Sequence, residues 1–436
     1  MVAKVLKNLN FSQMIRDGSV LAISGFNMGT TPDYLITQML DYYIKNSSPK
    51  NLFIISDALP ASPGRAFDNV MKYIYEENDT DLIRGMLVPF MGFSPYLQKD
   101  ALEGIIPIYS WPIGLTAYWL REIASGRPGL LTKIGIDTYL DPLNEGGALN
   151  ENAMKKKECR VREMKVDDER TLFYEGPKPD YAFIRASIAD SKGNLSVRDE
   201  PFRGTIMNIA QAVKAHPNPG KVYAQVLRIM NGGYITPIEV EVPWPLVDGV
   251  VKSPPEYHAQ ASSFNFDPVC KGFFAVSTIP DMFSNYEGGI IDAAALGFLQ
   301  VDQMGNVNPS ILPGKITGPG GFPVIAQGSP IAIFMGKFMA GKMEVSFVDG
   351  KLKIEREGDG IKFVKNVYKI LFSGRQASIH KKNVIYITER AVFELGTDGL
   401  VLKKVAPGID MDRDILEKME FRPKIDENYG EMEINL

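Results

Sequence analysis

The chain has 436 residues, of which 45% are hydrophobic and 23% are charged, as in an ordinary folded protein. This composition excludes disorder, a collagen-like repeat and a coiled coil as descriptions of the whole chain, and the length suits two or three domains. Lys and Arg number 48 against 52 Asp and Glu, so the net charge of −4 shows no basic excess of the kind that nucleic-acid-binding proteins carry.

Cysteine and histidine usage excludes several kinds of site. The two cysteines, Cys159 and Cys270, are too few for a disulfide framework or a Cys-ligated zinc site, and the three histidines show no metal-binding spacing. We therefore expect no metal. Residues 1–10 contain no apolar segment of signal-peptide length, and no apolar run is long enough to span a bilayer. We expect a cytoplasmic protein without a membrane partner.

The first elements along the chain are a strand, a glycine turn, a helix and a second strand. Residues 20–23 are apolar, and Ser24-Gly25-Phe26 follows as the turn. The pair Thr31-Pro32 predicts a helix with a hydroxyl N-cap and Pro at its first position, and apolar residues continue at helical spacing to residue 44. Residues 52–55 form the next apolar run. This β–α–β order predicts a parallel sheet covered by helices.

The alternation of strands and helices continues to residue 137. A polar stretch follows over residues 141–176, which we interpret as an exposed hairpin. The predicted strands are 86–88, 105–109 and 134–137, and the predicted helix is 115–125, ended by Gly126 and Pro128.

An internal repeat is the most informative feature of the sequence. Residues 180–194 and 292–306 share an aspartate, an apolar run, a second aspartate and a Gly-Asn pair at the same offsets. Each copy predicts a strand that ends in a D-x-x-G-N turn, where Gly or Asn supplies the positive φ. A second apolar strand follows each copy, at 222–226 and 331–335.

The repeat predicts two related α/β halves, with a binding cleft expected between them. The alternative is that two unrelated hairpins share the same turn chemistry. We place the boundary in a Pro-rich linker, giving an N-terminal domain over 1–266 and a shortened C-terminal domain over 267–436. The fold class is α/β, with two related, open, mostly parallel sheets and a β-rich C-terminal part that includes a hairpin around Asp349-Gly350.

Two segments could carry chemistry. In Thr317-Gly318-Pro319-Gly320-Gly321-Phe322, the glycines allow backbone N–H groups to approach an anionic ligand, although a tight turn without a ligand fits equally well. In Tyr286-Glu287-Gly288-Gly289, a carboxylate stands on a bending backbone beside a predicted strand and could act as a nucleophile or base. A surface turn is the alternative that the spacing favours.

Taken in order, these motifs resemble the family I coenzyme A transferases of the fused, single-chain acetate, propionate and 3-oxoacid type. The resemblance runs nearly from end to end. It rests on Asp17-Gly18-Ser19-Val20, Ser24-Gly25-Phe26, residues 129–142, Ala189-Asp190, Gly193-Asn194, Gly288-Gly289, Asp292, residues 301–302 and 305–308, Gly320-Gly321-Phe322, residues 386–390 and residues 406–410.

The resemblance implies transfer of CoA between an acyl-CoA and a free carboxylic acid. In this family a glutamate attacks the thioester, an acyl-glutamyl anhydride forms, and a glutamyl-CoA thioester follows. CoA is then a substrate, with no tightly bound cofactor. A glycine-rich loop holds the thioester and CoA, a role that Gly318 to Phe322 match.

The chain departs from the family at the nucleophile. The family carries a Glu-Ser-Gly or Glu-Asn-Gly motif early in its second domain, and neither tripeptide occurs here, where the chain between Pro268 and Tyr286 is short. Three alternatives remain open: a CoA-transferase with a relocated carboxylate, a CoA-thioester hydrolase or lyase with a carboxylate base, and a non-catalytic CoA-binding subunit.

The candidate site follows from these arguments. The predicted catalytic residue is Glu287. The predicted CoA- and substrate-binding residues are Gly25, Phe26, Gly288, Gly289, Gly318, Gly320, Gly321 and Phe322. The expected partners are an acyl-CoA, a small carboxylate and further copies of the chain, with a second CoA-transferase-like chain as the alternative protein partner.

Overall fold

The computed structural model describes residues 4–258 and 275–433. The predicted domain boundary at 266/267 and Cys270 lie outside the described residues. The chain forms two compact units. Unit 1 contains Met1–Thr132, Glu145–Met282 and Ile316–Gly320, and unit 2 contains Lys133–Asn144, Phe283–Lys315 and Gly321–Leu436.

Unit 1 is built on a nine-stranded sheet whose central strands are parallel and buried. Its order is β1-β14-β13-β11-β2-β3-β6-β7, with the short β12 paired antiparallel to β11. Every residue of β2, β3 and β11 is buried, because helices cover both faces of a parallel sheet. The strands are β1 (Lys4–Val5), β2 (Val20–Ile23), β3 (Leu52–Ser56), β6 (Ile83–Leu87), β7 (Ile108–Tyr109), β11 (Tyr181–Asp190), β12 (Leu195–Ser196), β13 (Lys221–Met230) and β14 (Gly249–Lys252).

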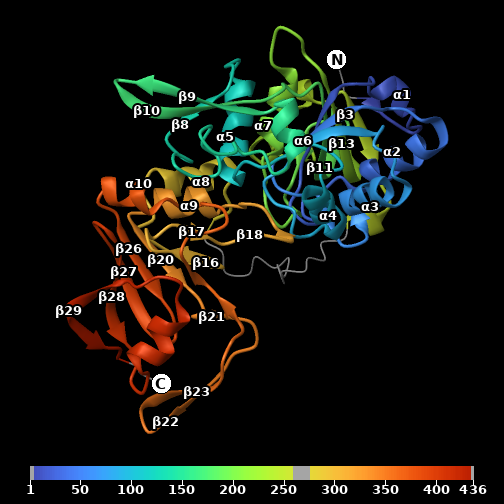
Figure 1. Cartoon of the computed structure of the whole chain (residues 1–436). Helices are drawn as coiled ribbons and strands as arrows, with labels where there is room; N and C mark the ends of the chain where they lie inside the picture. Colours follow the sequence, from blue (N-terminus) through green and yellow to red (C-terminus); the bar gives the residue numbers. More distant parts are fainter. Residues whose placement is uncertain (1–3, 259–274, 434–436) are drawn as a thin grey trace. The chain divides into compact units, whose positions relative to one another are not determined.

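The helices of unit 1 mostly connect successive strands, as the β–α–β pattern predicted. They are α1 (Phe11–Met14), α2 (Asp33–Asn46), α3 (Phe67–Glu77), α4 (Pro95–Glu103), α5 (Ile113–Ala124), α6 (Glu151–Lys156) and α7 (Ile206–Lys214). Of the stretch 141–176 that we predicted to be an exposed hairpin, residues 160–175 form one, with β9 (Arg160–Val166) paired to β10 (Glu169–Glu175) and projecting from the unit in Figure 1. The rest of the stretch contains α6, and Leu172 and Tyr174 of β10 are buried. Strand β10 also pairs with β8 (Leu130–Thr132).

Two local predictions in this part of the chain are wrong. Thr31 does not cap α2, because its hydroxyl donates to the Asn27 carbonyl; the first N–H groups of the helix donate instead to the side-chain oxygen of Gln225 on β13. Residues 134–137 form turns and not a strand, and the N–H of Gly135 donates to Gln327 within unit 2.

Unit 2 is built on a six-stranded sheet of order β15-β20-β26-β27-β28-β29. Strands β20, β26, β27, β28 and β29 run side by side in Figure 1. The first three strands of the sheet are parallel, and β26-β27-β28 are joined as antiparallel neighbours. The strands are β15 (Ala293–Gly297), β20 (Ile331–Met335), β26 (Asn383–Ile387), β27 (Ala391–Gly396), β28 (Gly399–Val405) and β29 (Lys424–Glu431).

Smaller elements complete unit 2. Helix α8 (Ile279–Glu287) ends before β15, α9 (Phe322–Gly328) before β20 and α10 (Gly374–Ile379) before β26. Strand β16 (Gln300–Asp302) pairs with β17 (Val307–Asn308) and β25 (Phe363–Val364). The predicted Asp349-Gly350 hairpin is confirmed as β22 (Glu344–Val348) and β23 (Lys351–Arg356).

The internal repeat is confirmed as the same structural motif in both units. In unit 1, Asp190 accepts from the backbone N–H of Asn194 at 2.9 Å and from its side-chain amide at 2.8 Å. In unit 2, Asp302 accepts from the same two groups of Asn306, each at 3.0 Å. Gly193 and Gly305 have φ of 101° and 75°. The following strands also match, since β11 pairs with β13 and β15 with β20, both in parallel.

Candidate functional site

Several candidate residues gather at the carboxyl ends of the parallel strands in unit 1. Gly25 lies two residues after β2, and Phe90 lies shortly after β6. From β2 the chain builds outward through β3, β6 and β7 on one side and through β11, β13 and β14 on the other. The point between β2 and β11 is therefore a topological switch point, where open α/β sheets hold their ligands.

The loop that follows β2 folds back so that Thr31 lies close to the backbone of Gly25, and this requires a glycine at position 25. Its φ is +125°, and a Cβ at this position would clash with the Thr31 hydroxyl and lie 2.8 Å from the Thr31 Cα. The Ser24 hydroxyl closes the same loop by donating to the Thr30 carbonyl at 2.7 Å. The sequence located this turn correctly, and the structure explains why only glycine fits there.

A buried ion pair, which we did not predict from the sequence, supports this loop. Arg185 on β11 donates from Nε and Nη2 to the two carboxylate oxygens of Glu200 at 2.9 and 2.6 Å, and both side chains are almost fully buried. Arg185 also donates to the Thr31 carbonyl, and Glu200 accepts from the Thr30 N–H. The only sequence signal is a single arginine inside an otherwise largely apolar run.

Asp57 is a second polar residue that sequence reasoning missed. It follows β3 directly and is 1% exposed, and its Oδ1 accepts from the Gly25 N–H at 3.2 Å. Burial raises the pKa of Asp57 to about 6, although hydrogen bonds from Thr205 and Gly25 act in the opposite direction. A carboxyl with such a pKa can change its protonation state near neutral pH.

The first part of the predicted glycine loop belongs to unit 1. Thr317 accepts from the Met91 N–H at 3.0 Å, and the Gly320 N–H donates to the Pro89 carbonyl at 2.9 Å. Gly318 has φ of +82°, and a Cβ there would lie 2.9 Å from the Pro89 carbonyl oxygen. The glycines therefore allow close backbone packing, and the Gly320 N–H is already engaged within the protein.

An aromatic cluster joins this glycine loop to the loop after β2. The ring of Phe26 lies 6.2 Å from that of Phe90, 5.4 Å from that of Phe93 and 6.2 Å from that of Phe202. Phe26, Phe90 and Phe202 are each partly exposed. A Cβ on Gly318 would lie 3.2 Å from the Phe90 Cα. The structure thus brings Gly25 and Phe26 together with Gly318 and Gly320 around a half-exposed apolar surface.

The remaining candidates lie in unit 2, at the two ends of α9. Glu287 is the exposed last residue of α8, and Gly289 has φ of +70°. This end of α8 contacts the end of α9, because a Cβ on Gly328 would clash with the Tyr286 carbonyl. Gly288 has its N–H engaged with the Ser284 carbonyl.

The other end of α9 holds Gly321 and Phe322. Gly321 is the N-cap of the helix, and a Cβ there would lie 2.9 Å from the ring of Phe283. Phe322 is 8% exposed, and its ring packs 5.7 Å from that of Phe334. Its side chain is part of the core of unit 2.

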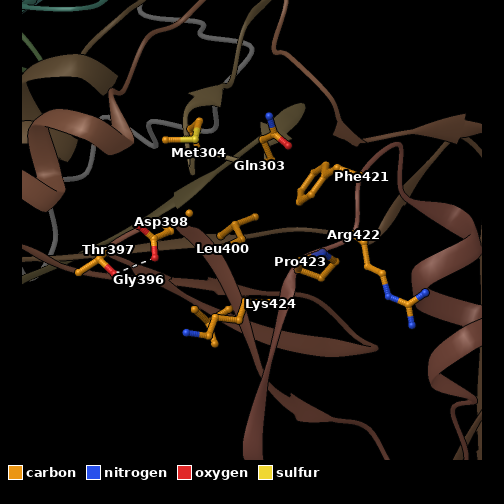
Figure 2. Close-up of a pocket in the computed structure, with 12 residues that line it drawn as sticks. Gln303, Met304, Gly396, Thr397, Asp398, Leu400, Phe421, Arg422, Pro423 and Lys424 are labelled. Atoms are coloured by element: carbon orange, nitrogen blue, oxygen red, sulfur yellow. Dashed lines mark hydrogen bonds between the residues drawn. The ribbon is translucent and has the colours of Figure 1, made fainter.

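A pocket of about 370 Å³ opens elsewhere in unit 2, beside the turn between β27 and β28 (Figure 2). Gln303, Asp398, Phe421 and Arg422 are among the residues that line it. None of the candidate site residues does so. Within residues 4–258 and 275–433, no group of three or more His, Cys, Asp or Glu side chains could hold a metal ion. None of the described helices is long and apolar enough to cross a membrane.

Comparison with known proteins gives the same family from sequence and from structure. The family model described as Coenzyme A transferase matches residues 10–253. The acetate CoA-transferase YdiF of Escherichia coli (strain K12) is 33% identical over 492 aligned positions, which cover 94% of this chain and 91% of that protein. The caffeate CoA-transferase of Acetobacterium woodii is 28% identical over 523 positions, covering 100% and 97%.

The similarity extends to three dimensions. The crystal structure of the acyl-CoA transferase YdiF from E. coli O157:H7, in a thioester complex with CoA, superposes with a TM-score of 0.89. The superposition has 30% sequence identity and covers 99% of this chain and 95% of that one.

The alignments also show that these relatives are longer. The alignment with the caffeate CoA-transferase has 523 positions and includes the whole of this chain, which has only 436 residues. The relative therefore carries residues that find no counterpart here.

Proposed function

The chain belongs to the coenzyme A transferase family, and we propose that it moves CoA between an acyl-CoA and a small carboxylic acid through a glutamyl intermediate. The observation that carries this proposal is the similarity to YdiF over nearly the whole chain, in sequence and in structure. The relatives named above act on acetate and caffeate, which supports a carboxylic acid as the acceptor.

The cluster of candidates in unit 1 supports a role in binding CoA. Its loops lie at the carboxyl ends of parallel strands, and the rings of Phe26 and Phe90 offer an apolar surface for the uncharged part of a CoA thioester. Gly318 and Gly320 bring backbone close to this surface without side chains. The contribution we assign to Gly320 is its lack of a side chain, since its N–H is engaged with Pro89.

Glu287 is the carboxylate that we propose as the nucleophile. It is exposed, and it is followed by two glycines that put no side chain in the way of a thioester. A carboxylate oxygen attacks the thioester carbonyl, the C–S bond breaks, and the CoA thiolate leaves an acyl-glutamyl anhydride. The thiolate then attacks the glutamyl carbonyl and releases the first acid. The acceptor acid reverses these two steps and regenerates the free glutamate.

Trapping of the enzyme-bound thioester tests this assignment. The protein is incubated with acetyl-CoA and reduced with borohydride, and the modified residue is located by mass spectrometry. We expect the adduct at Glu287 and a loss of CoA transfer to acetate of at least about 100-fold in Glu287→Gln, since a covalent step is removed. The matched control is Glu103→Gln, because Glu103 is also the exposed last residue of a helix followed by a glycine.

The same assay separates the alternative reactions. Full transfer activity in Glu287→Gln would contradict the assignment of the nucleophile while leaving the transferase proposal intact. Release of free acid from acetyl-CoA without any acceptor would indicate a thioester hydrolase. Binding of CoA without turnover of acetyl-CoA would contradict catalysis by the chain alone.

The oligomeric state and the location in the cell remain predictions. We propose a homo-oligomer in the cytoplasm with CoA as a substrate and not as a tightly bound cofactor. Size-exclusion chromatography with light scattering of the purified chain tests the first of these statements.

A further inference from the structure

Among the residues that the structure describes, β15 is an edge strand of the six-stranded sheet of unit 2, and we call its outer side the open edge. Strand β15 pairs in parallel with β20 on one side, and no strand within residues 4–258 and 275–433 pairs with its other side. Ala293, Ala295 and Gly297 are all exposed. The strand reads Ala-Ala-Ala-Leu-Gly and contains none of the charges or prolines that commonly protect an edge from pairing.

The internal repeat shows which strand pairs with the corresponding side of β11 in unit 1. Asp180 corresponds to Asp292, so Tyr181–Phe183 of β11 correspond to Ala293–Ala295 of β15. In unit 1 these three residues pair in parallel with Leu21–Ile23 of β2. Strand β11 therefore has a neighbour on both sides, whereas β15 has a described neighbour only on the side of β20.

The backbone of β15 is oriented to accept such a strand. The Ile331 N–H of β20 donates to the Asp292 carbonyl at 3.0 Å, which sets the register between the two strands. Backbone groups of successive strand residues point to opposite sides, so Ala294 and Leu296 face β20, while Ala293, Ala295 and Gly297 face the open edge. In unit 1 the corresponding Phe183 carbonyl accepts from the Ser24 N–H, just beyond β2.

One face of the sheet beside this edge is also incompletely covered. Ala295, Ile333 and Ile385 are in register across β15, β20 and β26 and are exposed or half-buried. Met335, on the same face, is 47% exposed. On the opposite face, Ala294, Ala332 and Phe334 are buried. In unit 1, by contrast, both faces of β2, β3 and β11 are buried.

We propose that the open edge of β15 and the apolar face beside it bind a second polypeptide, one that supplies an apolar parallel strand followed by an amphipathic helix. The segment has the chemistry of β2 and α2 in unit 1: the strand pairs with Ala293–Gly297 and the helix covers the face around Ile333. Alanines stand where unit 1 has Tyr181 and Phe183, which leaves room for the larger side chains of the incoming segment. This interaction is independent of which carboxylate attacks the thioester.

A second copy of this chain fits the edge less well. Its own strand of the required kind, β2, is already paired with both β11 and β3. Two copies of β15 related by a two-fold axis would pair antiparallel, which differs from the parallel pairing of β2 with β11. Such a pairing would supply no helix for the exposed face. The longer relatives show, in contrast, that homologous chains carry residues that this chain lacks.

Hydrogen exchange and co-purification test the proposal on the full chain. The probe is the longest stretch of E. coli YdiF that aligns opposite a gap in this chain, produced as a separate polypeptide and co-expressed. We expect a one-to-one complex by native mass spectrometry. The amides of Ala295 and Gly297 should exchange rapidly in the chain alone and become protected when the probe is bound.

Two substitutions locate the binding surface. Ala295→Arg places a charged side chain on the exposed face and should weaken probe binding at least 10-fold without changing the melting temperature of the chain. Ala293→Glu gives a second test should the first variant fold poorly. The control is Val348→Lys. Val348 lies on β22 of the β22–β23 hairpin, its side chain is 53% exposed, and it is distant in sequence from β15. The control variant should bind the probe within twofold of the parent chain.

Three results would overturn the proposal. The first is protection of the β15 amides in the chain alone, since the edge would then be covered by the chain itself. The second is a dimer of the chain that Ala295→Arg dissociates, since the occupant would then be a second copy. The third is failure of the parent chain to retain the probe.

Discussion

At the scale of single residues, the candidate site depends on glycines whose backbone conformations exclude other residues. Gly25 and Gly318 both have positive φ and both lie too close to neighbouring backbone for a side chain. Gly320 also has positive φ, at +54°, but the nearest atom to its Cβ position lies 3.9 Å away, on the ring of Phe90. A side chain at Gly320 would therefore extend over the aromatic cluster instead of displacing the loop.

Substitution of Gly320 by valine tests whether this surface binds CoA. We expect Gly320→Val to weaken CoA binding at least 10-fold in isothermal titration calorimetry, because the new side chain covers the ring of Phe90. Gly314→Val is the matched control: Gly314 has φ of +76° and no atom within 4 Å of its Cβ position. Both variants share a strain of about 1 to 2 kcal/mol for a non-glycine residue in this conformation. Equal CoA affinity in both variants would contradict the assignment.

Sequence reasoning found these glycines but missed the charged residues that hold the loop. Gly25 stood out because a glycine between a strand and a helix has a local explanation. The buried pair of Arg185 with Glu200 and the buried Asp57 have no such local explanation, because their burial depends on segments that are far apart in the chain. The side chain that serves the N-terminus of α2, Gln225, was missed for the same reason.

At the scale of elements, the D-x-x-G-N turn holds each repeat strand to a distant segment. The side-chain oxygen of Asn194 accepts from the Trp244 N–H at 3.0 Å, and that of Asn306 accepts from the Gly374 N–H at 2.9 Å. The asparagine of each repeat copy therefore accepts a hydrogen bond from the backbone N–H of a residue far along the chain. The offsets in the sequence predicted the turns, and the structure adds the contacts that explain why asparagine stands there.

Matched alanine substitutions should therefore destabilise different units. Each of Asn194→Ala and Asn306→Ala leaves a backbone N–H without its acceptor, at a cost of about 1 to 3 kcal/mol. All three tryptophans, Trp111, Trp119 and Trp244, lie in unit 1. We expect urea unfolding followed by tryptophan fluorescence to shift in Asn194→Ala and to stay unchanged in Asn306→Ala, while hydrogen exchange of β16 increases only in the latter. A shift of the fluorescence transition by both variants would contradict this assignment.

The two copies of the repeat differ in the continuity of their first strand, which we did not predict. In unit 1 the strand β11 is continuous over ten residues, whereas its counterpart is divided into β15 and β16, which belong to different sheets. The break falls at Phe298, which is 5% exposed and lies under the Lys362 ammonium, 3.9 Å from its ring centre. Apolar periodicity cannot show such a break, because both halves of the run remain apolar.

At the scale of the whole molecule, the turn that the two repeat copies share was predictable, but the edge position of β15 among the described strands of unit 2 was not. Strand β15 has an apolar sequence like that of any central strand, and only the pairing pattern of the described strands places it at an edge. The sequence indicated a short segment before it, and the structure shows which side of the sheet lacks a described neighbour.

Stability should also depend on pH through a buried acid of unit 1. Asp100 on α4 is 1% exposed, and burial raises its pKa to about 7, although the Ile106 N–H lowers it. Because the folded-state pKa lies above the unfolded value, the native state binds the extra proton between about pH 4 and pH 7. The free energy of unfolding should therefore fall as the pH rises through this window, by on the order of 1 to 4 kcal/mol from this group.

The variant Asp100→Asn removes this titration. We expect its free energy of unfolding, measured by urea and tryptophan fluorescence at several values between pH 4 and 8, to vary less with pH than that of the parent chain. The variant should be the more stable protein at pH 8, where the parent must bury a charged carboxylate. A parallel pH dependence in the two proteins would contradict the assignment.

Unit 1 consists of three separate segments of the chain, and this affects the order in which its parts can fold during synthesis. Domains generally fold as units while the ribosome extends the chain from its N-terminus. The backbone hydrogen bonds of Pro89 and Met91, however, are made with Gly320 and Thr317. These two residues belong to unit 1 but are synthesised long after its sheet. A nascent chain can therefore assemble this sheet early, but it acquires the glycine loop beside Phe26 and Phe90 only after most of unit 1 and the first strands of unit 2 have been synthesised.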